Sequence, residues 1–110
     1  MEMTTRISKG RDGWEANTHL DMQEANRVLI VTTRKMTGGM VTRAMVNTDS
    51  GNGFLSWNLF GDFSTRTQYK GVRCTEKTVR DLHQQALAAI DQTLAAARAH
   101  YQAKQVQEAA

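Results

Sequence analysis

The fold is decided at one junction in the chain, which reads Gly71-Val72-Arg73-Cys74-Thr75-Glu76-Lys77-Thr78-Val79. Before Thr75, apolar and polar residues alternate in short runs that Gly, Asn and Asp interrupt, as in half-buried strands. After Thr75, apolar residues recur every three or four positions without any Pro, which is typical of a long amphipathic helix. We therefore expect an α+β fold, because a sheet and a helix can bury their apolar faces against each other.

Upstream of the junction, residues 4–73 predict a curved antiparallel sheet of four to five strands in meander order. Trp14–Met22 alternates most clearly, and Arg27–Lys35 and Met40–Thr48 are rich in β-branched residues. The glycines between the last two suit a tight hairpin. The other expected strands or extended arms are Thr5–Lys9, Phe54–Phe60 and Thr65–Val72.

A two-residue hairpin loop near Gly38 would fix which side chains share a face of the sheet. The less charged set is expected to face the helix, and it contains Leu29, Val31, Thr33, Lys35, Met40, Thr42, Ala44 and Val46. The opposite face then carries Arg34 and Arg43, which would lie close enough to repel each other.

The helix is expected from Thr75, as N-cap, to about Lys104, with residues 105–110 as a frayed tail. Thirty residues make a helix about 45 Å long, whereas a strand of six residues spans only about 20 Å. The second half of the helix would therefore overhang the sheet and need a second copy of the chain. The predicted homodimer interface is Leu87, Ile90, Leu94, Ala97 and Tyr101.

No catalytic or metal-binding pattern is found in the 110 residues, which are expected to form one domain. The three histidines lack the spacing of a ligand pair, and His83 on the helix seam is expected at the edge of the core. Cys74 lies beside basic residues before the helix, but no His neighbours it, so a structural role is favoured over a nucleophile. We expect neither an enzyme nor a cofactor.

The sequence also bears on the compartment. The first residues contain no apolar signal region, and no apolar run is long enough to cross a bilayer. The single cysteine cannot form an internal disulfide. A cytoplasmic protein with no membrane association is expected.

Basic residues concentrate around the junction of sheet and helix, in a small basic protein with net charge +3. Positive charges beside aromatic rings are typical of proteins that bind single-stranded nucleic acids. The candidate nucleic-acid-binding residues are Arg34, Arg43, Arg66, Lys70 and Arg73, with Phe54, Phe60 and Tyr69 as aromatic partners. Strand edges also carry Lys and Arg simply to prevent aggregation, and exposed aromatics can belong to a protein interface.

The segment Tyr69–Val79, followed by Leu82 and Ile90-Asp91, resembles the single-stranded-DNA-binding transcriptional coactivators of the positive-cofactor-four type, and more distantly the Whirly proteins. The resemblance is specific over some 25 residues and implies four curved strands followed by a helix that forms a dimer. Lys70 matches the basic position of that family before the helix, and Gly71 matches its glycine. The basic, aromatic first hairpin of the family has no clear counterpart here.

Two functions are therefore expected from the sequence. The first is non-catalytic binding of nucleic acid, specifically single-stranded DNA, by a homodimer. The alternative is a protein-interaction module, such as a phage- or plasmid-type inhibitor or adaptor, which binds a protein partner through its sheet face or its helix.

Overall fold

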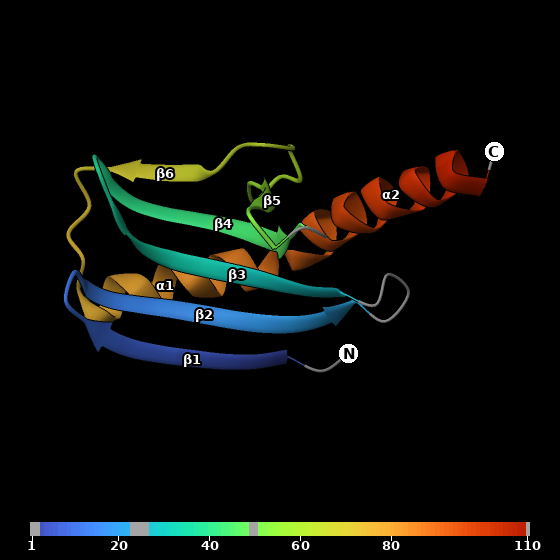
Figure 1. Ribbon diagram of the computed structural model, residues 1–110. Helices are drawn as coiled ribbons and strands as arrows, with labels where there is room; N and C mark the ends of the chain where they lie inside the picture. Colours follow the sequence, from blue (N-terminus) through green and yellow to red (C-terminus); the bar gives the residue numbers. More distant parts are fainter. Residues whose placement is uncertain (1–2, 23–26, 49–50, 110) are drawn as a thin grey trace.

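The computed structural model describes residues 3–22, 27–48 and 51–109, which form an antiparallel sheet with two consecutive helices packed on one side (Figure 1). This arrangement confirms the predicted α+β class. The elements in chain order are β1 (Met3–Gly10), β2 (Gly13–Met22), β3 (Arg27–Met36), β4 (Gly39–Asn47), β5 (Phe54–Trp57), β6 (Thr67–Lys70), α1 (Glu76–Ala88) and α2 (Ile90–Ala109).

The described strands number six, where four to five in meander order were expected. Strands β1 to β5 do follow a meander, but β6 departs from it and pairs with β4. Strand β4 is long enough to hold two short partners along one edge: Gly39–Thr42 pair with β6, and Ala44–Asn47 pair with β5. The predicted strand Phe54–Phe60 is accordingly shorter, because the chain turns after Trp57 to reach the position of β6.

The hairpin between β3 and β4 confirms the predicted division of faces. Met36 pairs with Gly39, so Thr37 and Gly38 form a two-residue loop. Gly39 has φ of 134°, and a side chain there would collide with the backbone of Tyr69 on β6. We call the side packed by the helices the inner face and the opposite side the outer face. Arg34 and Arg43 belong to the outer face, as their pairing with Val41 and Thr32 requires.

The single helix predicted from Thr75 is wrong, because the chain forms two helices that meet at Ala89. Ala89 has φ of −98° and ψ of 9°, outside the helical region, and its amide donates to the carbonyls of both Gln85 and Ala86. No Gly or Pro marks this break. The bend lets α1 pack on β2 and β3 while α2 passes along β5. The tail expected to fray from residue 105 is helical as far as Ala109.

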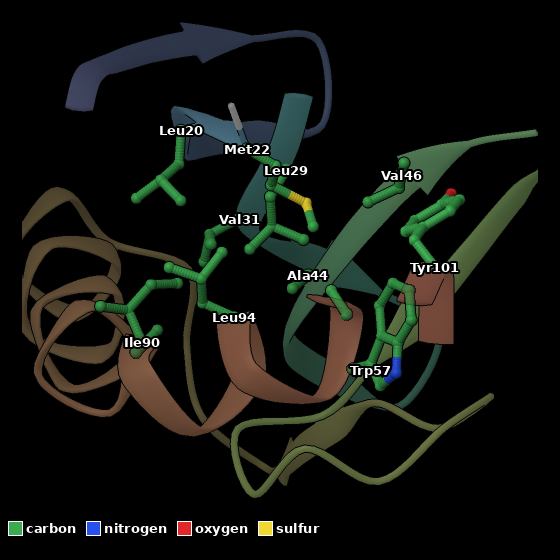
Figure 2. Close-up of a cluster of buried hydrophobic side chains, with 12 residues drawn as sticks. Leu20, Met22, Leu29, Val31, Ala44, Val46, Trp57, Ile90, Leu94 and Tyr101 are labelled. Carbon is green, nitrogen blue, oxygen red and sulfur yellow. The ribbon is translucent and has the colours of Figure 1, made fainter. Parts of the chain in front are cut away.

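The main core lies between the inner face and α2, and Figure 2 shows its side chains pointing toward one another from both layers. Ile90, Leu94, Ala97 and Tyr101 are at most 8% exposed in the single chain, and Leu87 is partly exposed. These residues were predicted to need a second copy, but Trp57 and the strands already cover most of them. Although the C-terminal part of α2 does extend beyond the sheet (Figure 1), most of the seam is buried without a second copy of the chain.

A smaller core joins α1 to the strands near the two hairpin turns. Ala16, Met40, Val79 and Leu82 are buried there, and Tyr69 and Cys74 pack against them. The thiol of Cys74 donates to the backbone carbonyl of Trp14 at 3.2 Å. Cys74 therefore packs in this smaller core, which agrees with the structural role favoured over a nucleophile.

His83 was predicted at the edge of the core, and the structure differs. Its side chain is only 2% exposed and lies under the centre of the sheet. Its Nε2 lies 2.7 Å from the hydroxyl of Thr18, and its Nδ1 lies 2.9 Å from the hydroxyl of Thr33. The chain of hydrogen bonds continues from Thr18 to Thr5 at 2.8 Å and from Thr33 to Thr42 at 3.0 Å. This threonine–histidine network joins α1 to four strands.

Burial lowers the pKa of His83 to about 4, well below the usual value near 6.5. Between these values the unfolded chain binds a proton that the folded protein excludes, so the free energy of unfolding should fall as the pH drops through this window. The loss should total about 3 kcal/mol, be complete near pH 4 and be absent above about pH 7.

Urea unfolding at several pH values measures this effect, with His83→Gln as the control. Glutamine keeps a donor and an acceptor but does not titrate, and both proteins share the same carboxylates. The difference in stability between the two proteins should change across the window. Parallel pH curves would contradict the prediction.

The burial of the α2 seam leads to a second expectation. Leu94→Ala should lower the free energy of unfolding by about 3 kcal/mol, because it leaves a cavity in the core of the single chain. Sedimentation should show the same oligomeric state as the parent protein, and Ala95→Ser on the exposed side of the helix should have little effect. A folded monomer produced from a dimer by Leu94→Ala would restore the dimer argument.

Candidate nucleic-acid interface

Three of the predicted basic residues gather on the outer face. Thr32 pairs with Arg43, and Arg34 is the next outer-face residue of β3. Arg66 immediately precedes β6, whose Thr67 pairs with Thr42 of β4, so Arg66 lies beside Arg43. We call Arg34, Arg43 and Arg66 the arginine row, since together they cross the face from β3 to the start of β6.

The charges in this row lie close enough to affect one another. The pKa of Arg43 is lowered, first by burial and then by the positive charges of Arg66 and Arg34. The Nε of Arg43 is buried and has no hydrogen-bond partner among the described residues. Arg43 is thus a partly desolvated cation with like charges on both sides, which is an unfavourable arrangement in the isolated protein.

Apolar and aromatic groups border the arginine row. The guanidinium of Arg43 lies over the ring of Phe54, 4.7 Å from its centre, in a cation–π contact. Phe54 and Val28 are each 47% exposed at that end of the face. At the other end, Val41 is fully buried although it faces outward, because it lies between the long side chains of Arg34 and Gln68.

Strand β1 extends the interface beyond the residues that the sequence singled out. Arg6 pairs with Asn17, Asn17 with Thr32, and Thr32 with Arg43, so all four lie at one level of the outer face. The hydroxyl of Thr32 donates to Asn17 at 2.9 Å. The alternation of Thr5–Lys9 could have revealed Arg6, had its pairing register with β2 been known.

Acidic side chains are sparse but present on this face. Glu15 lies directly opposite Arg34 in the pairing of β2 with β3. It therefore offsets part of the charge at the β3 end of the row, whereas no carboxylate is among the groups that perturb the pKa of Arg43. The excess of positive charge is greatest at the β4 and β6 side.

Lys70 and Arg73 lie at the end of the molecule where the hairpin turns meet the start of α1. Lys70 pairs with Gly39, and Arg73 is exposed in the segment between β6 and α1. An open depression of about 280 Å³ lies beside the β1–β2 turn at this end. Its lining is mixed in charge and consists of Gly10, Arg11, Asp12, Gly13, Trp14, Glu15, Arg34 and Lys35.

Two predicted aromatic partners lie elsewhere. Tyr69 pairs with Met40 and so belongs to the inner face, where burial raises the pKa of its hydroxyl. Its face depends on the register of β6, which the sequence does not reveal. Phe60 is 72% exposed, but it lies in the turn after β5 rather than on a strand. Of the aromatic candidates, only Phe54 contacts the arginine row.

The described part of the chain contains no group of three His, Cys, Asp or Glu residues able to hold a metal ion. The described helices also include none that is long and apolar enough to cross a membrane.

Comparison with models of known protein families, with curated proteins and with solved structures finds no match to this chain. The resemblance to the positive-cofactor-four type therefore rests on the junction residues alone and stays a prediction.

The repulsion in the arginine row should be measurable without any ligand. Arg66→Gln should raise the free energy of unfolding by about 0.5 kcal/mol at low salt, because it removes a like charge beside Arg43. The gain should disappear in about 1 M salt, where the Debye length is only about 3 Å.

Arg80→Gln is the matched control, because it makes the same change on the opposite layer of the molecule. Arg80 pairs with Glu76 at 2.9 Å within α1, so its loss should lower stability by about 0.3 kcal/mol. Destabilisation by both variants would contradict repulsion within the row.

Proposed function

We propose that this protein binds single-stranded nucleic acid, without catalysis, on the outer face of its sheet. The observation that carries the proposal is the arginine row, in which Arg43 lies between two like charges and keeps a buried, unpaired Nε. A phosphodiester oxygen would accept a hydrogen bond from such a guanidinium and neutralise the repulsion around it. The row is unfavourable alone and becomes favourable beneath a polyanion.

The surroundings of the row favour single strands over duplexes. A duplex is read by a helix or a narrow β-ribbon inserted into a groove, whereas the outer face is broad and built from several strands. Exposed apolar groups such as Val28 and Phe54 lie beside the charges. Unpaired bases present apolar faces to such groups, and bases also stack on guanidinium planes.

A protein partner is the second candidate, and the apolar end of the outer face favours it. Phe54 and Val28 are half-exposed beside an arginine, and aromatic residues, Met and Arg are enriched in the centres of protein interfaces. A protein partner would have to supply carboxylates for the arginine row. A homodimer is compatible with either function. The apolar residues of α2 do not require one, because most of them are buried in the single chain.

The test compares the parent protein with Arg43→Gln/Arg66→Gln, using a labelled oligothymidylate and a duplex of equal length at several salt concentrations. The parent should prefer the single strand. In the double variant, the dissociation constant should rise at least about tenfold, because two charged hydrogen-bond donors are lost. The slope of log affinity against log salt should flatten by about 1.4, or 0.7 for each phosphate contact.

Arg80→Gln/Lys77→Gln removes the same charge from the exposed side of α1 and serves as the control. This control should change the affinity by no more than about twofold, through the net charge alone. Equal losses from both double variants would mean diffuse attraction to a basic protein. Absence of binding by the parent at low salt would leave a protein partner as the better proposal.

A further inference from the structure

Two threonines of the threonine–histidine network occupy the same strands as two members of the arginine row. Thr33 precedes Arg34 on β3, and Thr42 precedes Arg43 on β4. Successive residues of a strand point to opposite faces. A hydrogen bond on the inner face therefore fixes the backbone from which the neighbouring arginine projects on the outer face.

The network is built to hold the two strands at one spacing. Thr33 and Thr42 are directly paired, both are fully buried, and their hydroxyl oxygens lie 3.0 Å apart. The hydroxyl of Thr33 also bonds Nδ1 of His83, so its rotation is restricted. Nε2 is bound to Thr18 on β2, and this second bond leaves the ring little freedom to turn. Such directional bonds specify a register more strictly than apolar contacts do.

We propose that His83 is a positioning residue for the outer face, which through Thr33 and Thr42 holds Arg34 and Arg43 at the separation and direction that phosphate binding requires. The biological meaning of this inference rests on the proposed function. The physical claim, that the inner-face network sets the arrangement of the arginines, concerns the free protein and is tested there as well.

Three variants separate positioning from simple stability. His83→Leu replaces the imidazole ring with an apolar side chain of moderate size and so removes both ring hydrogen bonds. His83→Gln places an amide donor and acceptor near the positions of the two nitrogens and should restore the bonds. Val79→Ala weakens the packing of the same helix face one turn earlier, in a residue that is fully buried and takes no part in the network.

Binding to oligothymidylate gives the first measurement, with the active fraction of each variant determined by stoichiometric titration. In His83→Leu, the salt slope should flatten by about 0.7, the value for one phosphate contact, and the dissociation constant should rise roughly tenfold. Val79→Ala lowers only the amount of folded protein, so its slope should equal that of the parent. His83→Gln should also recover the parent slope.

The NMR signal of the Arg43 Nε–H group gives the second measurement, in the absence of nucleic acid. This group lies by the ring of Phe54, so the ring current reports its position. The signal should move in His83→Leu and stay in place in His83→Gln and Val79→Ala. The same signal shift in Val79→Ala would assign the effect to general loosening and overturn the inference.

The outcomes distinguish the inference from the proposed function. If the parent binds and His83→Leu keeps the parent salt slope, the positioning role is wrong while the proposed function stands. If the parent fails to bind any oligonucleotide, the proposed function is wrong, and the Arg43 signal still decides whether His83 positions the row. An unmoved signal in His83→Leu would overturn the inference in either case.

Discussion

The hydrogen-bonded ring of His83 is the constraint on which the arrangement of both faces depends. A slip of β3 by one residue would turn Thr33 outward and bury Arg34 beneath the helices, and the same slip of β4 would do this to Thr42 and Arg43. A slip of β3 would also take Thr33 away from Nδ1 of His83 and leave this nitrogen unpaired in a dry site, which is costly for a buried polar group. The network therefore adds to the apolar pattern of the inner face, which a one-residue slip would also turn outward, in specifying this register.

The same network explains why a helix of modest apolar character holds its place. Apart from His83, α1 buries only Val79, Leu82 and Ala86. Its exposed side is stabilised by ion pairs of Glu76 with Arg80 and of Lys77 with Asp81, each worth only a few tenths of a kcal/mol. The position of α1 on the sheet is thus set by a polar contact, and its apolar contacts supply the rest of the stability.

Periodicity in the sequence predicted those parts of the fold that depend on local pattern. The alternation of Trp14–Met22 follows from a period of two, and so does the outward direction of Arg34 and Arg43 once the glycines near Gly38 set a two-residue loop. The pairing of β6 and the break at Ala89 do not, because a four-residue strand carries too little pattern and Ala-Ala contains no helix breaker. Both features depend on contacts with segments that are distant in the sequence.

The arginines of the candidate site were predictable from the sequence, but the contact of Arg43 with Phe54 was not. This contact limits the kind of binding to expect. Arg43 lies over one face of the Phe54 ring, so a base that stacked on this face would displace a favourable cation–π contact. Stacking on the guanidinium of Arg34 or Arg66 would leave that contact in place. Such contacts do not read base identity. A ligand held in this way would be recognised through its phosphates and exposed base planes, so affinity should depend strongly on salt and weakly on sequence.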